Sequence, residues 1–180
     1  MKPQRIVILG GTGFVGSHIV PRLHADGHTI VILSRNREQH RDLSVLPRAS
    51  VVTADVHDGE VLRRQLAGAD VAINLVGILN ERGSDGSGFR KAHVELTETL
   101  IAACRAAGVA RLLQMSALRA GEGESFYLIT RGEAEAKVKS SPLAWTIFRP
   151  SVIFGRGDGL FYRFANLLRM TPVLPLARAN

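Results

Sequence analysis

The chain has 180 residues, of which 46% are hydrophobic and only 6% aromatic, a balance that suits one domain with an aliphatic core. Its net charge is +7, but the 19 arginines and 4 lysines are scattered along the sequence, which argues against a nucleic-acid partner. The amino terminus lacks the pattern of a signal peptide, and no apolar stretch approaches the roughly 18 residues of a membrane span. We therefore expect a cytoplasmic protein, with peripheral contact to the inner membrane at most.

Short β-branched runs alternate with longer helical patterns along most of the chain. The expected strands are Arg5–Leu9, Thr29–Leu33, Ser50–Ala54, Asp70–Val76, Arg111–Ala117 and Ala144–Pro150. The expected helices are Phe14–Gly27, Asp58–Gly68, Phe89–Gly108 and Ser125–Ser140, followed by a helical segment from Leu160 to Met170. Alternation of this kind is typical of parallel strands joined by helical crossovers. It predicts an α/β fold with a doubly wound parallel sheet, in the order 3-2-1-4-5-6.

The glycine-rich stretch ILGGTGFVG follows the first expected strand and opens the first expected helix. It satisfies G-x-G-x-x-G through Gly11, Gly13 and Gly16, and G-x-x-G-x-x-G when counted from Gly10. Glycines here allow a sharp turn, a close approach to a pyrophosphate and tight packing of helix on strand, while the helix N–H groups face the phosphates. We predict a dinucleotide site formed by Gly10, Gly11, Thr12, Gly13, Phe14, Val15 and Gly16. The alternative is a glycine-rich turn that binds nothing.

The end of the second expected strand carries basic residues where a carboxylate is typical of NAD sites. The region reads ILSRNRE, with Ser34, Arg35 and Arg37 in place of Asp or Glu. A guanidinium at this place suits a ribose 2′-phosphate both by charge and by bidentate geometry. We therefore expect NADP(H) to be preferred, with NAD(H) as the other possible cofactor. The alternative is that both arginines are solvated loop residues.

Several motifs in order resemble one known family. GGTGFVG, ADVHD, INLVGIL, HVELTETLIAACRAAGV and RPSVIFGRGD are similar to segments of the extended and atypical short-chain dehydrogenase/reductases, the NAD-dependent epimerase/dehydratase clan. NLVGILNERG followed by FRKAHVELT resembles most closely the branch that includes the accessory NADPH-binding subunit of respiratory complex I and its bacterial relatives. The resemblance implies a Rossmann domain over residues 1–155, and the start of a truncated substrate-binding region over residues 156–180.

The same resemblance assigns roles to residues outside the glycine stretch. It implies cofactor contacts at the carboxyl edge of the sheet from Asp55, Val56, Leu75, Val76, Gly77, Ser116, Arg131 and Pro150. It also implies that Ser116 and Tyr127 stand at catalytic positions and that Arg131 occupies the place of the catalytic lysine. No metal-ligand cluster is apparent in the sequence.

Each of these positions has a structural alternative. Asp55 can form a turn or cap a helix, Ser116 can be a small residue chosen for space, and Tyr127 can be a half-buried packing residue. Asn74 can satisfy backbone groups at a strand end. His93 is better explained as an inward-facing, hydrogen-bonded histidine than as a base.

Two departures from the family pattern bear on chemistry. Arg131 lies four residues after Tyr127, on the same helix face, and it can supply a positive charge but cannot relay a proton as a lysine can. Only ten residues separate Ser116 from Tyr127, fewer than is usual in the family. We therefore favour a weakly catalytic or non-catalytic NADP(H)-binding accessory or assembly factor, with respiratory-complex or quinone-biosynthesis proteins as partners. The alternatives are an active reductase, epimerase or dehydratase acting on a small carbonyl or sugar nucleotide, and a redox-sensing regulator.

Overall fold

A computed structural model of the chain describes residues 2–36, 43, 45–81, 83–158, 166, 168 and 169. The chain divides into two compact units, Met1–Pro150 and Ser151–Asn180. In the second unit, the Gly155 N–H donates to the Asp158 carboxylate at 3.1 Å and the Asp158 N–H donates to the Gly155 carbonyl, which closes a turn. The helix expected from Leu160 to Met170 lies largely outside the described residues and stays a prediction.

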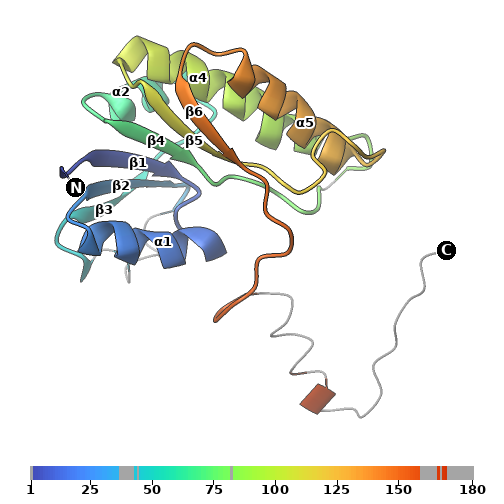
Figure 1. The fold of residues 1–180 in the computed structure, drawn as a ribbon, viewed down its shortest axis with the longest axis horizontal. Coiled ribbons are helices and arrows are strands. Elements are labelled where there is room, and N and C mark those ends of the chain that lie inside the picture. Colours follow the sequence, from blue (N-terminus) through green and yellow to red (C-terminus); the bar gives the residue numbers. More distant parts are fainter. Residues whose placement is uncertain are drawn as a thin grey trace. The chain divides into compact units, whose positions relative to one another are not determined.

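The first unit is built on six parallel strands in the order β3-β2-β1-β4-β5-β6, as expected from the sequence (Figure 1). The strands are β1 (Arg5–Leu9), β2 (Thr29–Ser34), β3 (Ala49–Thr53), β4 (Val71–Asn74), β5 (Arg111–Met115) and β6 (Ala144–Phe148). The order reverses at β1, which pairs with β2 on one side and with β4 on the other. Such a reversal opens a crevice at the carboxyl edge of the sheet, where ligands of this fold class bind.

Two hydrophobic layers cover the sheet because consecutive strand residues point to opposite faces. Ile6 and Ile8 pack on the face that also buries Val20 of α1 (Phe14–Ala25). Val7 and Leu9 pack on the other face, which is covered by α2 (Gly59–Leu66), α4 (Leu96–Ala107) and α5 (Phe126–Lys139). Figure 1 shows α1 on one side of the strands, with α4 and α5 on the other.

Residue types that commonly cap helices stand at the ends of α2, α4 and α5. Asp58 caps α2, its carboxylate accepting from the N–H groups of Glu60 and Val61, and Ser125 caps α5 by accepting from Leu128. Gly108 ends α4 in the left-handed conformation, with φ of 75°, which glycine adopts without the cost that a Cβ brings.

The long helix expected from Phe89 to Gly108 is interrupted. It consists of α3 (Ser87–Arg90), a π-helical turn η2 (Lys91–Glu95) and α4. Inserted π turns occur frequently at functional sites, where they reorient a side chain. Here the turn carries His93, whose side chain is buried against α5.

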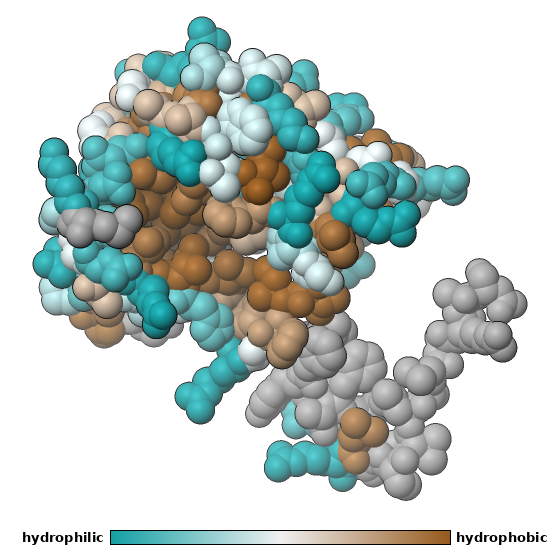
Figure 2. Space-filling model, viewed as in Figure 1, coloured by the Kyte–Doolittle hydropathy of each residue, from teal (hydrophilic) through white to brown (hydrophobic). Residues whose placement is uncertain are grey.

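Some apolar surface of the first unit stays exposed. Figure 2 shows a hydrophobic area in the part of the view where Figure 1 shows the strands. Large apolar residues with more than a third of their surface exposed include Leu79, Leu118, Phe126, Trp145 and Phe148. Within the described part of the chain, no helix has the length and apolar character needed to cross a membrane.

Candidate functional site

The turn between β1 and α1 has glycines at positions where neighbouring backbone leaves no space for a side chain. Gly10 has φ of 73°, and a Cβ added to it would lie 3.0 Å from the Val76 nitrogen. A Cβ on Gly16 would overlap the Gly11 backbone, so α1 can approach the turn only because residue 16 is glycine. The glycine spacing therefore serves close packing of helix on strand, as expected from the sequence.

The amino end of α1 is open to an anion. Gly13 is the N-cap, and no side chain among the residues that the structure describes caps this end. The first N–H groups of a helix have no partner within the helix, and the helix dipole places partial positive charge beside them. The first turn of α1 also contains no acidic residue. This end can therefore receive a phosphate group.

The residues expected beside the adenosine half of a dinucleotide lie at the ends of β2 and β3. Ser34 is the last residue of β2, and its hydroxyl exchanges hydrogen bonds with the Asn36 backbone at 3.3 Å. Arg35 follows it with an exposed side chain. Arg37 lies outside the described residues, so its predicted contact is not addressed by the structure. Asp55 forms a turn by accepting from the His57 N–H at 2.9 Å, and Val56 packs at the edge of the core.

The turn after β4 is fixed by Asn74. The strand ends at Asn74 rather than at Val76 as expected, because the Asn74 side-chain oxygen accepts from the Val76 N–H at 3.1 Å. The other end of this amide donates to Gln114 of β5. The turn Leu75–Gly77 is thereby held beside Gly10 and joins the phosphate turn to the β5 side of the edge.

Arg131 lies at the centre of the β5 side of the carboxyl edge of the sheet. Only 5% of its surface is exposed. Its Nη1 donates to the carbonyls of Met115 at 3.0 Å and Val76 at 3.4 Å, and its Nη2 lies so close to Gly77 that a Cβ there would overlap it. Burial lowers the pKa of the guanidinium, which still stays charged at neutral pH because its ordinary value is so high.

Tyr127 and Arg131 meet on one face of α5, as their spacing predicted. The Arg131 Cζ lies 5.4 Å from the centroid of the Tyr127 ring. The half-buried ring also contacts Phe89 and His93 edge-on, at centroid distances of 6.0 Å and 5.5 Å. Tyr127 therefore combines a packing role with a position beside a permanent positive charge.

His93 is buried and hydrogen-bonded, as expected. Its Nδ1 lies 2.9 Å from the Thr130 hydroxyl, and its Nε2 accepts from the Ile78 N–H at 3.5 Å. Burial, and to a smaller extent the charge of Arg131, lowers the pKa of His93 to about 3. The imidazole is therefore neutral at physiological pH and adds no charge to the site.

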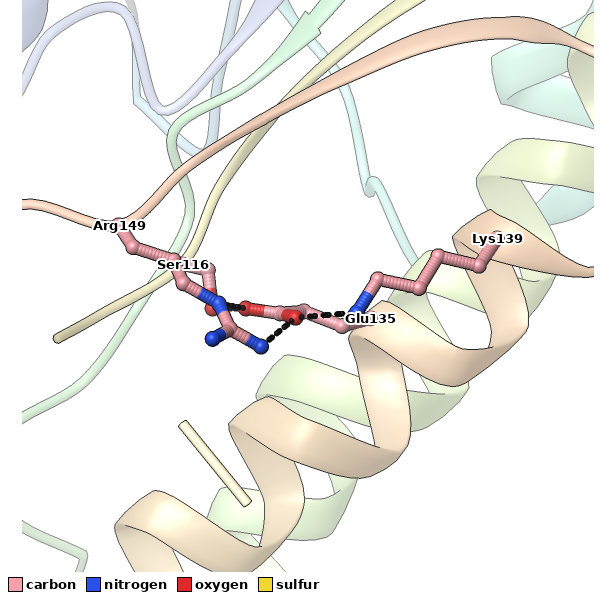
Figure 3. Close-up of polar contacts among 4 residues, drawn as sticks. All are labelled: Ser116, Glu135, Lys139 and Arg149. Carbon is pink, nitrogen blue, oxygen red and sulfur yellow. Dashed lines mark hydrogen bonds and ion pairs between the residues drawn. The ribbon is translucent and has the colours of Figure 1, made fainter. Parts of the chain in front are cut away.

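Ser116 belongs to a buried polar cluster (Figure 3). Its hydroxyl donates to the Glu135 carboxylate at 2.6 Å. The same carboxylate, which is only 2% exposed, accepts two hydrogen bonds from Arg149 and one from Lys139 at 3.1 Å. Burial alone would raise the pKa of Glu135, but the hydrogen bonds from Arg149, Ser116 and Lys139 outweigh it and lower that pKa to about 2. The cluster fastens α5 to the ends of β5 and β6.

The structure thus brings some predicted residues together and separates others. Arg131, Tyr127, Val76 and Gly77 meet at one point of the sheet edge. The Ser116 hydroxyl instead points to Glu135 (Figure 3), and Pro150 contributes its carbonyl, which accepts from the Leu118 N–H. Sequence reasoning missed Glu135 and Arg149. Glu135 follows Tyr127 and Arg131 at four-residue spacing, which places a carboxylate on the inward face of α5 and was the available signal.

No metal site emerges beside these groups. Among the residues that the structure describes, no cluster of three or more His, Cys, Asp or Glu side chains could hold a metal ion. The described groups at this edge are the amino end of α1, the buried guanidinium of Arg131 and the phenol of Tyr127.

Comparison with known proteins gives consistent matches. Residues 10–163 match a family model described as NAD(P)H-binding. The chain is 34% identical over 175 residues to the ceramide reductase of Caulobacter vibrioides, covering 95% of this chain and 53% of that protein. It is 28% identical over 164 residues to the 40 kDa subunit of mitochondrial NADH-ubiquinone oxidoreductase of Neurospora crassa, covering 89% and 43%. The chain spans about half the length of these relatives.

A solved structure agrees in fold. The enzyme WbmG of Bordetella bronchiseptica, solved in complex with NAD and UDP, superposes with a TM-score of 0.81. The match covers 94% of this chain and 60% of that one, at 21% identity. At this identity the likeness establishes the Rossmann architecture and nothing finer.

Proposed function

The chain belongs to the NAD(P)H-binding family, and from that premise we propose that it is an NADP(H)-binding protein with weak or no catalysis. It acts as an accessory or assembly factor linked to NADH-quinone oxidoreductase or quinone metabolism. The observation that carries the weak-catalysis part is the hydrogen bond from the Ser116 hydroxyl to Glu135. Because of that bond, the Ser116 hydroxyl donates its proton within a structural cluster. In addition, Arg131 occupies the position of the family's catalytic lysine.

The described residues fit a nicotinamide dinucleotide. Gly10 and Gly16 let the turn pack tightly against the backbone of Leu75–Val76 and of Gly11, and no side chain among the described residues caps the amino end of α1. Arg131 offers a second point of attachment, because its buried Nε has no hydrogen-bond partner among the described residues. The phosphates would bind at α1, and Arg131 would donate toward the nicotinamide half. When bound, the dinucleotide would supply hydride chemistry.

The preference for NADP(H) rests on Arg35. Its exposed side chain follows the end of β2, where the adenosine ribose binds in this fold class, and a guanidinium there favours a 2′-phosphate. NADPH should therefore raise the melting temperature more than NADH does. Arg35→Asp should reverse that order. Arg105→Asp is the matched control, because exposed Arg105 lies near the carboxyl end of α4. No shift with either dinucleotide would refute cofactor binding.

The geometry around Tyr127 limits acid–base chemistry. A general acid of this kind needs its pKa brought toward neutrality and a path that returns its proton. Arg131 supplies positive charge near the ring, but a guanidinium does not release a proton at physiological pH. The neighbouring His93 is neutral and already engaged by Thr130 and Ile78. We therefore expect turnover to be slow or absent.

An active NADP(H)-dependent reductase is the second candidate. It is favoured by the half-exposed Tyr127 beside a cation, and by the 34% identity to a protein named ceramide reductase. This candidate predicts NADPH oxidation with a panel of lipid and small carbonyl substrates. It also predicts loss of that oxidation in Tyr127→Phe with unchanged NADPH binding. Absence of turnover in the wild type with every carbonyl would exclude it.

The accessory role is tested by association. The 40 kDa relative is named as a subunit of NADH-ubiquinone oxidoreductase, and we expect the present protein to copurify with a quinone-linked respiratory assembly at the cytoplasmic face of the membrane. Tagged protein should be recovered from membranes together with that assembly, and high salt should release it if contact is peripheral. Recovery only in the soluble fraction, free of respiratory proteins, would contradict this role.

A further inference from the structure

We propose that Arg131 makes this site discriminate the redox state of the dinucleotide, binding NADPH more tightly than NADP⁺. The inference rests on the proposed function, because it requires that a dinucleotide bind along the carboxyl edge of the sheet. It adds a property to that function, since a protein that favours the reduced form responds to the NADPH/NADP⁺ ratio.

Arg131 is a buried cation with no carboxylate counter-charge in the part of the chain that the structure describes. It is 5% exposed and forms no ion pair with a carboxylate among the described residues. Its hydrogen bonds go to the neutral carbonyls of Met115 and Val76 and to the side chain of Tyr127, and its Nε has no partner among the described residues. A buried charge that is not paired acts strongly on any other charge brought near it, because little water screens the interaction.

The groups around Arg131 do not cancel its charge. His93 is uncharged at neutral pH, because burial and Arg131 itself hold its pKa at about 3. Glu135 lies one turn further along α5, but it is shared by two cations, Arg149 and Lys139 (Figure 3). That cluster has one negative and two positive charges, so it adds positive rather than negative charge to the surroundings.

The topology directs the nicotinamide half of a dinucleotide toward this point. In a doubly wound sheet the pyrophosphate binds at the first turn, and the two nucleosides extend to opposite sides of the position where the strand order reverses. The β2 side carries Arg35, so the adenosine half belongs there. On the β4 side, Gly10 of the phosphate-binding turn lies against the backbone of Val76. Gly77, which follows Val76 in the chain, lies directly against the Arg131 guanidinium.

The two redox forms differ there by one unit of charge. The oxidised nicotinamide ring is a cation and the reduced ring is neutral, while the phosphates and the adenosine half are the same in both. At an effective dielectric of about 20, repulsion between two positive charges about 10 Å apart is worth about a tenfold difference in dissociation constant. Arginine retains its charge throughout the physiological pH range, so this discrimination is permanent.

Isothermal titration of the full chain with NADPH and with NADP⁺ tests the inference. We expect the wild type to bind NADPH about tenfold more tightly. Arg131→Met, which keeps an unbranched apolar stem and removes the charge, should bring the ratio of the two dissociation constants close to one, and Arg131→Gln should do the same. Arg131→Lys should keep the preference. Lys137→Met is the matched control, because it removes an exposed charge of the same helix that pairs with Glu98.

The outcomes separate the inference from its premise. Equal affinities in the wild type, or an unchanged ratio in either neutral variant, would overturn the inference and leave dinucleotide binding intact. Failure to bind either form, and failure to bind adenosine 2′,5′-bisphosphate, which has no nicotinamide, would overturn the proposed function itself. The wild-type ratio needs no variant, so a ratio of one overturns the inference even if no substitution at Arg131 folds.

Discussion

Replacement of Glu135 by glutamine should destabilise the protein in a pH-dependent way. The substitution keeps the size of the side chain and an oxygen for the Ser116 hydroxyl, but removes the charge that holds Arg149 and Lys139. Those contacts join α5 to the ends of β5 and β6 (Figure 3). The measured loss of unfolding free energy should therefore reflect the contribution of the charged cluster and not the creation of a cavity.

The size of the effect follows from the pKa of Glu135. It falls from an ordinary 4.5 to about 2, which corresponds to about 3 kcal/mol at about 1.36 kcal/mol for each pKa unit. The side chains of Lys139 and Arg149 are 49% and 40% exposed, so water screens part of this interaction. We expect Glu135→Gln to lower the free energy of unfolding by about 2 kcal/mol at pH 7.

The sign of the pH dependence is also fixed. Because the folded-state pKa lies below the unfolded one, the stabilisation is complete above about pH 4.5 and is lost as the pH falls toward 2. Urea denaturation of wild type and Glu135→Gln should therefore give unfolding curves that differ at pH 7 and converge only as the pH falls through about 2. Glu133→Gln is the control, because Glu133 is 38% exposed and forms a surface pair with Arg90.

Two results would refute this reasoning. One is a Glu135→Gln variant no less stable than Glu133→Gln at pH 7, which would mean that desolvation offsets the whole ionic contribution. The other is a stability difference that stays constant between pH 6 and pH 2.5, which would mean that the charge of Glu135 does not cause it.

Three further perturbations test the site. Gly16→Ala should lower the melting temperature and abolish the NADPH-induced shift, because its Cβ overlaps the Gly11 backbone, whereas Gly59→Ala, with ordinary contact at 3.6 Å, should be tolerated in both assays. Gly77→Ala should displace the Arg131 guanidinium and cost about 1–3 kcal/mol in chemical denaturation; an unchanged stability would show that Arg131 does not need its present position. His93→Asn should remove a fall in stability of up to about 1.4 kcal/mol per pH unit below pH 6.5, because the folded protein keeps His93 neutral until about pH 3; an identical pH profile in the variant would contradict its buried, neutral state.

Much of the fold could be predicted because its signals are local. Runs such as RIVIL and TIVIL are buried strands by composition alone, and glycines mark the turn after β1 and the end of α4. The parallel order follows from the alternation of strands and helices, and the structure confirms it. The family resemblance, read from motifs in order, is likewise confirmed by the NAD(P)H-binding match over residues 10–163.

Boundaries were less predictable where side chains from elsewhere intervene. β4 ends at Asn74 rather than at Val76 because the Asn74 amide takes the next N–H group of the turn and bonds to Gln114 on the neighbouring strand. The helix expected from Phe89 to Gly108 contains a π turn, and no periodicity in the sequence signals it. The turn accommodates His93 against Thr130 of α5, a contact across 37 residues.

The sequence by itself determined that this chain forms a doubly wound sheet with an open helix amino end, because glycine spacing and strand patterning depend only on neighbouring residues. It also placed Tyr127 and Arg131 on one helix face, since four-residue spacing suffices for that. Only the tertiary structure decided where the Ser116 hydroxyl points and what surrounds Arg131. Both depend on hydrogen-bond partners brought together from distant strands, and the burial that makes an unpaired charge influential is a property of the packed fold alone.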